Sequence, residues 1–380
     1  MCCTIEAQLK GVFLKIQAAI LESVGSKFKI EEVDLAEPKE NEVLVKIKAS
    51  GLCASDLNAI DGKRNLVPFP AVIGHEAAGI VEKCGTNVSD FSPGDHVVLS
   101  IVPNCGNCKY CKSGNPNFCL LAGNSMFEGN LFDGTSRLSK DGKKINHFLT
   151  TASFAEYAVV PSSGLVKIKK EMPLDRAALI SCAVLTGFGA VTNTAKVKED
   201  SNVAVFGCGG VGLNIIQGAK IAKAKNIFAI DIAEEKLSLA KKLGATNLIN
   251  SINSDPVQII KEITDGGVDF AFEALGKEET IQSAWKSVGP FGSLTLVGLM
   301  KHGAKLTIEA GPFVNEQSIK GCYFGSSDIQ RDVPNLVEKY LTGELKLDEL
   351  ISRRINLNEL NGAFEQLRKG EGARSVLVFE

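Results

Sequence analysis

The sequence predicts an α/β protein in which a doubly wound parallel sheet is inserted into a β-rich domain. Between about residues 16 and 160, strand-like runs alternate with turns rich in glycine, proline and aspartate. Between about residues 202 and 324, short apolar strands alternate with helical segments, a rhythm typical of βαβ units. The chain beyond Phe324 carries two amphipathic helix candidates and a closing strand. We expect this C-terminal part to return to the β-rich domain.

The β-rich part is predicted from apolar runs that are separated by turn formers, such as the tetrapeptide that begins at Ser92 (Ser-Pro-Gly-Asp). Its expected strands are Glu42–Lys48, Ala78–Lys83 and His96–Ile101. In the second part, the expected strands are Val203–Phe206, Ile227–Ile230, Phe270–Phe272 and Leu294–Val297, with a helix at Glu234–Leu243. The C-terminal part is expected to form helices at Val333–Leu341 and Leu357–Leu367 and a strand at Ser375–Phe379.

Composition excludes several classes of protein. Hydrophobic residues make up 44% of the 380 residues and charged residues 23%, as in globular proteins with a sizeable core. The net charge of −2 provides no basic field for nucleic acid. Apolar runs such as Ala177–Leu185 are shorter than the roughly 20 residues that span a bilayer, and Glu6, Lys10 and Lys15 interrupt the N-terminal segment, unlike a signal peptide. We therefore expect a cytoplasmic protein without nucleic-acid or membrane partners.

A glycine-rich turn after the strand Val203–Phe206 indicates a dinucleotide site. In the segment Gly207-Cys-Gly209-Gly-Val211-Gly212, the first glycine permits a tight turn, the second lets a pyrophosphate approach, and the third lets helix pack on strand. Asp231 ends the next strand, where a carboxylate hydrogen-bonds the ribose hydroxyls and disfavours a 2′-phosphate. The segment therefore predicts NAD binding. The alternative is a glycine turn in a domain that binds no ligand.

Four cysteines with short spacings predict a structural zinc site. They are Cys105, Cys108, Cys111 and Cys119. Four thiolates complete a tetrahedral zinc shell and leave no position for water or substrate. An iron–sulfur cluster and incidental cysteines are the alternatives, but the order of gaps fits neither common ferredoxin pattern. The odd total of 11 cysteines argues against a disulfide framework.

A further motif resembles a known family. The segment Gly74-His75-Glu76-x2-Gly79-x5-Gly85-x2-Val88 is very similar to the zinc signature of the zinc-containing medium-chain alcohol dehydrogenases. The four-cysteine loop, the glycine-rich turn and Asp231 follow in that family's order, and the likeness runs from about Ile16 to Phe379. The segment that begins at Asp133 resembles the larger, often dimeric branch, which includes the liver-type and glutathione-dependent enzymes.

The resemblance implies a domain organisation and a function. It implies a GroES-like, β-rich catalytic domain over residues 1–183 and 324–380, and an inserted Rossmann NAD-binding domain over residues 184–323. It implies a homodimer, with a tetramer as the alternative, that transfers a hydride between an alcohol and NAD and yields an aldehyde or ketone. Two zinc ions per subunit are expected, one catalytic and one structural. The catalytic zinc would act as a Lewis acid that favours the alkoxide form of the alcohol.

The resemblance also assigns residues. Cys53, His75 and Cys182 would bind the catalytic zinc, with Glu76 as a nearby carboxylate that exchanges with them. Taken alone, each of these residues would be interpreted as an ordinary core side chain. The remaining implied roles are a proton relay from Ser55, orientation of His75 by Asp56, cofactor contacts from Lys236 and Arg374, and an apolar substrate pocket formed by Ile101, Phe148, Leu149 and Leu299.

Several positions depart from the family pattern. Ala54 stands where many members carry an arginine or histidine that binds pyrophosphate, and we expect weaker NAD binding as a result. Asn58 stands at the position of the relay histidine, and an amide does not accept a proton at neutral pH. The positions that hold charged glutathione adducts in one branch are here Arg64, Leu66 and Gly123.

These departures leave three alternatives to alcohol oxidation. One is an S-hydroxymethylglutathione (formaldehyde) dehydrogenase, although the charge pattern for that adduct is not preserved. Another is a lyase on the same scaffold, such as a hydroxynitrile lyase. The third is a binding protein without catalysis, whose natural mark would be loss of Cys53, His75 or Cys182, yet all three are present.

Overall fold

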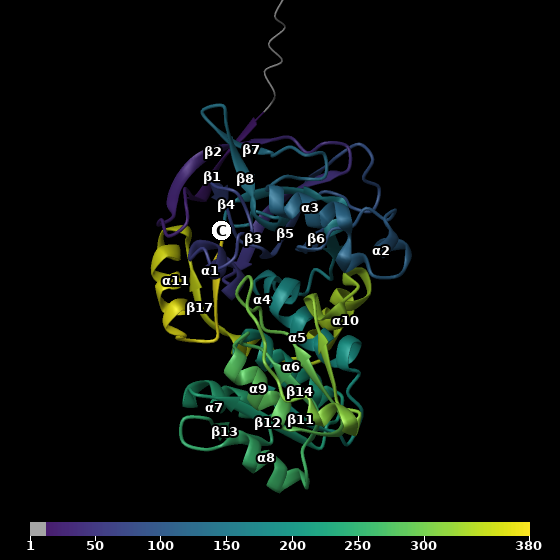
Figure 1. Ribbon diagram of the computed structural model, residues 1–380. Helices are drawn as coiled ribbons and strands as arrows, with labels where there is room; N and C mark the ends of the chain where they lie inside the picture. The colour runs from purple at the N-terminus through teal and green to yellow at the C-terminus, as the bar shows by residue number, and fades with distance from the viewer. Residues whose placement is uncertain (1–12) are drawn as a thin grey trace, which may run out of the picture.

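The computed structural model describes residues 13–380 and contains two lobes. Figure 1 shows strands from the first half of the chain in the upper lobe and a sheet flanked by helices in the lower lobe. The C-terminal segment, coloured yellow, returns to the upper lobe, where the chain ends. The predicted fold class is therefore confirmed, including the insertion of the parallel sheet into the β-rich part.

The upper lobe combines a small barrel with a larger sheet. The barrel consists of β1 (Phe13–Leu21), β2 (Lys29–Ala36), β7 (Leu138–Lys140), β8 (Lys143–His147) and β4 (Ala71–Val72). The seven-stranded sheet has the order β10 (Leu165–Lys167), β6 (His96–Leu99), β5 (Glu76–Cys84), β3 (Glu42–Gly51), β18 (Arg374–Val378) and β17 (Ile351–Ile355), with β9 (Tyr157–Pro161) also paired to β3. The C-terminal β18 runs antiparallel to β3, and Val376 lies opposite Gly51.

Helices and short turns connect these strands. The helices of this lobe are α1 (Ala54–Ile60), α2 (Lys109–Lys112), α3 (Leu120–Glu128), α10 (Ile329–Leu341) and α11 (Leu360–Lys369). Single 3-10 turns lie at Pro116–Phe118, Phe148–Thr150, Ser162–Gly164, Phe324–Ser326, Asp348–Leu350 and Leu357–Glu359. The helix expected at Val333–Leu341 begins at Ile329, because the Asp328 side chain accepts a hydrogen bond from the Gln330 backbone N–H (3.1 Å) and caps the helix there.

The lower lobe contains a six-stranded, fully parallel sheet. Its order is β13 (Asn247–Asn250), β12 (Asn226–Asp231), β11 (Asn202–Phe206), β14 (Val268–Glu273), β15 (Val288–Leu296) and β16 (Ser318–Gly321). Its helices are α6 (Gly210–Ile221), α7 (Glu234–Leu243), α8 (Pro256–Thr264) and α9 (Glu278–Lys286), and a 3-10 turn lies at Gly311–Asn315. The strand order reverses at β11, which creates a crevice at the carboxyl end of that strand.

One long helical segment joins the lobes. It runs through α4 (Leu174–Leu179), a π-helical turn (Ile180–Val184), α5 (Leu185–Gly189) and a second π-helical turn (Ala190–Ala195). Over 22 residues it is long and apolar enough to cross a membrane, which the shorter run considered in the sequence did not indicate. However, 78% of its apolar window is buried within the protein, as in a core helix. The domain boundary expected between residues 183 and 184 falls inside this helix.

His147, at the end of β8, gives the fold a specific dependence on pH. Its side chain is fully buried, and its Nε2 accepts a hydrogen bond from the Arg137 backbone N–H (3.1 Å). Burial, and then the positive charges of Arg137 and Lys144, lower the pKa of His147 to about 3. Below pH 6.5 the unfolded chain takes up a proton at this residue and the folded chain does not, so stability is lost as the pH falls from about 6.5 towards 3.

We predict that His147→Gln removes this part of the pH dependence, because glutamine keeps an acceptor but does not titrate. The free energy of unfolding should fall between pH 7 and pH 5 by about 2 kcal/mol more in the unsubstituted protein than in the variant. Denaturant titrations at the two pH values measure the difference. His302→Gln, at an exposed histidine, is the matched control. An unchanged pH dependence in His147→Gln would contradict the prediction.

Candidate metal and cofactor site

Four side chains from distant parts of the chain converge at the junction of the lobes. They are Cys53, His75, Glu76 and Cys182, and one ligand atom from each lies within 4.8 Å of the others. Cys53 is the N-cap residue of α1, Glu76 begins β5, and Cys182 lies in the π-helical turn Ile180–Val184. All four are buried. The structure therefore brings together the ligand set that the sequence resemblance implied.

Asp56 fixes two of these ligands. Its Oδ2 accepts a hydrogen bond from the Cys53 backbone N–H (2.9 Å), and its Oδ1 lies 2.9 Å from Nδ1 of His75. A carboxylate at this distance assigns the proton of the neutral imidazole to Nδ1. Nε2 then presents a lone pair, and it is buried without a hydrogen-bond partner among residues 13–380. An orphaned imidazole nitrogen beside two cysteine sulfurs is a donor set that fits Zn²⁺.

The pKa values of the titratable groups in this cluster differ strongly from their ordinary values. A hydrogen bond from Cys182 is the main cause that lowers the pKa of the Cys53 thiol well below its ordinary value, and the same contact raises the pKa of Cys182. Burial lowers the pKa of His75, but the charges of Asp56 and Cys53 raise it by more than burial lowers it. The pKa of His75 therefore stands well above its usual value. In the metal-free chain a proton on His75 therefore balances the Cys53 thiolate, and a divalent cation at this place would take over that role and release the proton.

Arg374 connects this cluster to the glycine-rich turn. Its Nη2 lies 2.7 Å from Glu76 Oε1, and its Nη1 donates to the Leu52 carbonyl (2.8 Å). Burial raises the pKa of Glu76 to about 8, although the charge of Arg374 opposes this shift. A Cβ added at Gly210 would meet Arg374 Nε at 2.5 Å, so the guanidinium lies against the turn. That Nε–H is buried and has no partner among the described residues, so it is free to donate to an anion there.

The glycine-rich turn has the shape that a pyrophosphate requires. Gly207 has a φ of +97°, and a Cβ at Gly212 would lie 1.8 Å from the Gly207 carbonyl oxygen, so neither position accepts a side chain. Gly209, the N-cap of α6, faces open space, because a Cβ there would have no neighbour within 4 Å. An anion can therefore approach the free N–H groups at the start of α6, in which Val211 is half-buried.

Asp231, at the end of the neighbouring strand β12, binds the glycine-rich turn through its carboxylate. Its carboxylate accepts hydrogen bonds from the backbone N–H groups of Cys208 (2.8 Å), Ile232 (2.8 Å) and Ala233 (3.1 Å). A carboxylate has about four lone-pair sites, so it retains capacity for a ribose hydroxyl. Lys236 is half-buried in the first turn of α7, five residues further along the chain.

The second cysteine cluster has the compact geometry expected for a closed metal site. The sulfurs of Cys105, Cys108, Cys111 and Cys119 lie within 4.8 Å of one another. Backbone N–H groups of Cys105 and Cys108 point at sulfurs, at 3.3 and 3.4 Å. Such hydrogen bonds, from Cys111 and then Leu120, lower the pKa of the Cys108 thiol to about 6. All nine cysteines of residues 13–380 are free thiols.

One of the four predicted pocket residues, Phe148, contacts the metal-ligand cluster, and two more lie in the same core. Ile101, Phe148 and Leu149 are at most 9% exposed and belong to the same packed core as Cys53 and Cys182. The ring centroids of Phe148 and His75 are 5.8 Å apart. The fourth residue, Leu299, is 48% exposed and lies on the loop after β15.

Tyr323 also packs against this core but was not selected from the sequence. Burial raises its pKa to about 12, the charge of Cys182 adds to that effect, and the charge of Arg64 opposes it. The tyrosine hydroxyl therefore lies within electrostatic range of both the ligand cluster and Arg64. No local pattern around residue 323 could have identified it, because its position depends on where the chain crosses from β16 towards α10.

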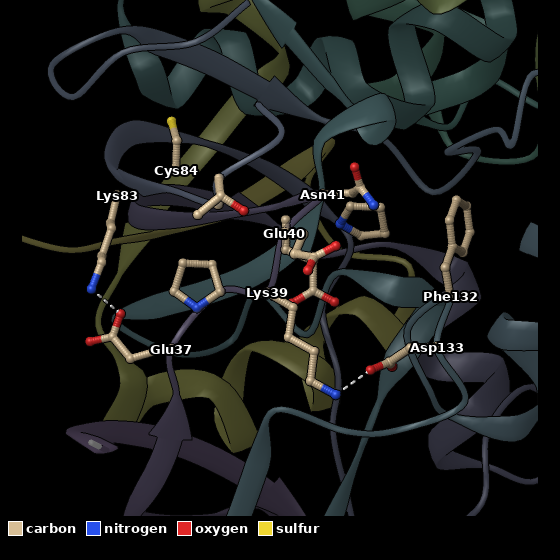
Figure 2. A pocket seen from close by; sticks show the side chains of 13 residues that line it. Glu37, Lys39, Glu40, Asn41, Lys83, Cys84, Phe132 and Asp133 are labelled. Carbon is tan, nitrogen blue, oxygen red and sulfur yellow. Dashed lines mark hydrogen bonds and ion pairs between the residues drawn. The ribbon is translucent and has the colours of Figure 1, made fainter. Parts of the chain in front are cut away.

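A cavity of about 660 Å³ lies elsewhere in the upper lobe. Figure 2 shows that it lies between the segment after β2, the end of β5 and Asp133, with ion pairs Lys83–Glu37 and Lys39–Asp133 along its walls. It contains none of the predicted site residues, and these charged groups already pair within the protein. We therefore place the candidate site at the metal-ligand cluster and not at this cavity.

Comparisons with known proteins agree with this geometry. Two family models match the chain, "Alcohol dehydrogenase GroES-like domain" over residues 39–170 and "Zinc-binding dehydrogenase" over residues 210–341. An alcohol dehydrogenase class-P from Arabidopsis thaliana is 39% identical over 372 residues, which cover 97% of this chain and 98% of that protein.

Two solved structures are similar over 97% of this chain and 100% of their own. The benzyl alcohol dehydrogenase from Acinetobacter calcoaceticus is 36% identical with a TM-score of 0.92. An alcohol dehydrogenase zinc-binding domain protein from Burkholderia ambifaria is 35% identical with a TM-score of 0.93.

We predict that the buried Glu76–Arg374 pair stabilises the junction of the lobes. At pH 9, where the Glu76 carboxyl group (pKa about 8) is ionised, Glu76→Gln should lower the free energy of unfolding by about 3–5 kcal/mol, because it leaves the Arg374 charge buried without its carboxylate. The double variant with Arg374→Met should recover part of this loss in a double-mutant cycle. Glu199→Gln, which breaks an exposed pair with Lys223, should change stability by less than about 1 kcal/mol. Equal effects of Glu76→Gln and Glu199→Gln would contradict the prediction.

Proposed function

Because the chain belongs to the zinc-containing medium-chain alcohol dehydrogenase family, we propose that it interconverts an alcohol and its carbonyl product with NAD at a zinc ion bound by Cys53, His75 and Cys182. The family makes the chain an oxidoreductase that acts on small-molecule alcohols. The observation that carries the proposal is the convergence of two cysteine sulfurs and an unpartnered imidazole nitrogen beside the glycine-rich turn.

Cys53, His75 and Cys182 would hold the metal, and a set of three protein ligands is typical of zinc sites that act on a substrate. When bound, zinc supplies the Lewis acidity that favours loss of the hydroxyl proton. Asp56 holds His75 in the tautomer that binds metal. Glu76 is the nearby carboxylate for exchange, and its ion pair with Arg374 holds it in place.

The proton would leave through Ser55, which is half-buried in the first turn of α1. Asn58, one turn further along the helix, has an amide that does not accept a proton at neutral pH. We therefore propose that the relay passes from Ser55 to water.

The crevice at the carboxyl end of the parallel sheet would hold NAD, which would supply the hydride acceptor. The start of α6 and the free Nε–H of Arg374 provide donors for the pyrophosphate. Asp231 and Lys236 would bind the adenosine ribose, and the Asp231 carboxylate favours NAD over NADP. Ala54 supplies no charge to the pyrophosphate, so we expect moderate NAD affinity.

The remaining features complete the proposal. The four-cysteine cluster would bind a second, structural zinc, because four sulfurs leave no open position. The division into a catalytic domain (1–183 and 324–380) and an NAD-binding domain (184–323) is retained as a proposal, as are cytoplasmic residence and a homodimer. The apolar lining by Ile101, Phe148 and Leu149 supports an apolar alcohol.

We predict two zinc ions per chain, each removed by a different substitution. Cys182→Ser should lower the metal content to one and reduce kcat by more than about 100-fold, because it removes a ligand of the catalytic ion. Cys111→Ser should also leave one zinc but act mainly by lowering the thermal midpoint. Elemental analysis, NAD reduction rates and thermal unfolding measure these effects. Cys84→Ser, outside both clusters, is the control, and equal zinc content in all three variants would contradict the assignment.

The function itself is tested by NAD reduction with a panel of substrates. We predict oxidation of benzyl alcohol and of medium-chain primary alcohols, since the pocket lining is apolar and a similar protein is a benzyl alcohol dehydrogenase. The panel includes S-hydroxymethylglutathione and a cyanohydrin. Strong preference for the glutathione adduct would replace the proposal with the formaldehyde activity. Cyanohydrin cleavage without any NAD reduction would replace it with a lyase.

A further inference from the structure

The Gly74 carbonyl, which directly precedes His75, is held by a buried threonine that has no role in the mechanism above. The hydroxyl oxygen of Thr151 lies 2.9 Å from this carbonyl oxygen, and the Ser153 backbone N–H donates to the same oxygen at 3.1 Å. Thr151, Ser153 and His75 are at most 1% exposed. The backbone on the N-terminal side of this metal ligand is therefore fixed by a segment from a distant part of the chain.

The single proton of the Thr151 hydroxyl has two acceptors within reach. The Phe148 carbonyl oxygen lies 3.0 Å away, but it already accepts the backbone N–H groups of Thr151 (3.0 Å) and Ala152 (3.2 Å). A carbonyl oxygen has two lone pairs, so these two donors occupy both of them. The Gly74 carbonyl accepts the Ser153 N–H and retains its second lone pair for the hydroxyl. The hydroxyl proton is therefore assigned to Gly74.

The backbone around Thr151 adopts a conformation that is unfavourable for its residue types. Leu149, Thr150 and Ala152 have φ values of 50°, 60° and 54°, in the left-handed region. A β-branched residue such as Thr150 rarely occupies this region, because its side chain crowds the backbone. Such conformations persist where the surrounding structure imposes them, and they cluster at functional sites. Here the conformation brings the Thr151 hydroxyl to the backbone that carries His75.

The segment Phe148–Phe154 contacts the surroundings of His75 at both of its ends. At its start, the ring of Phe148 lies edge-on to the ring of His75, with 5.8 Å between the centroids. At its end, the Phe154 backbone N–H donates to the Ile73 carbonyl at 2.9 Å. Because Phe148 is also a predicted pocket residue, the wall of the pocket and the support of the metal ligand belong to the same segment.

We propose that Thr151 is a positioning residue that holds Gly74 and thereby directs Nε2 of His75 towards the catalytic metal. This inference rests on the proposed function and adds to it a residue that acts through His75. Asp56 fixes the imidazole through Nδ1, and Thr151 fixes the backbone from which the imidazole projects. Without the hydroxyl, the Gly74 carbonyl would lose one of its two donors, and the imidazole would be held less firmly beside the two sulfurs.

The test follows zinc release from the purified holoenzyme into an excess of the chelating dye 4-(2-pyridylazo)resorcinol. Two phases are expected, and the phase that is missing in Cys182→Ser belongs to the catalytic ion. Thr151→Val, which keeps the shape of the side chain but removes the hydroxyl, should speed this phase by about tenfold or more. The phase of the four-cysteine cluster should change by less than about twofold, because that site is independent of Thr151. Thr151→Ser should restore slow release of the catalytic ion.

Cobalt substitution at the catalytic site provides a second measurement that needs no turnover. The visible absorption bands of Co²⁺ depend on the arrangement of its ligands, so they should shift in Thr151→Val and return in Thr151→Ser. Thr151→Ser and Thr151→Ala form a further matched pair, because they differ only in the hydroxyl. Thr151→Ala should release the catalytic ion about tenfold faster than Thr151→Ser. This pair keeps the proposal testable even if Thr151→Val does not fold.

Thr264→Val is the matched control, because the Thr264 hydroxyl donates to the Ile260 carbonyl (2.6 Å) in α8 of the other lobe. It should lower the thermal midpoint without changing either phase of zinc release. The proposal is overturned if loss of the Thr151 hydroxyl leaves the catalytic phase unchanged, speeds both phases equally, or is not rescued by Thr151→Ser. In these cases the unsubstituted protein still releases two zinc ions and reduces NAD, so the proposed function stands. An unsubstituted protein that reduces no NAD and releases zinc in one phase would overturn both.

Discussion

The buried carboxylate of Asp56 is the contact on which the geometry of the metal site depends. It is fully buried and links two segments that carry ligands, the start of α1 through the Cys53 backbone and the segment before β5 through the His75 ring. Burial raises the pKa of Asp56, while the charge of His75 opposes that shift. One side chain therefore sets both the imidazole tautomer and the approach of the first cysteine.

The second constraint joins the metal ligands to the cofactor turn. Arg374 begins β18, the final strand, and the pairing of β18 with β3 carries its guanidinium to Glu76 on one side and to Gly210 on the other. The long helix from Leu174 to Ala195 delivers Cys182 from within a π-helical turn. Residues from both ends of the chain thus form one continuous site, which explains why the inserted sheet and the β-rich lobe belong to one catalytic unit.

Local patterns were predictable from the sequence, and long-range arrangements were not. The glycine-rich turn and the four-cysteine loop are encoded within a few residues, so spacing alone indicated their chemistry. Cys53, His75 and Cys182 lie on separate elements, so only resemblance to a family connected them. Strand β15 starts at Val288, earlier than the expected Leu294, because the chain pairs with β14 through an irregular register across its glycines and proline. Tyr323 has no local signal, because its position depends on how the chain passes from β16 to α10.

The central claim is that Cys53, His75 and Cys182 together bind a divalent zinc ion beside the cofactor turn. Anomalous diffraction from crystals of the purified protein, recorded on both sides of the zinc absorption edge, tests it most directly. The account predicts one zinc peak between the two sulfurs and Nε2 of His75, and a second peak inside the four-cysteine cluster. A peak in the four-cysteine cluster alone, in fully active protein, would contradict it.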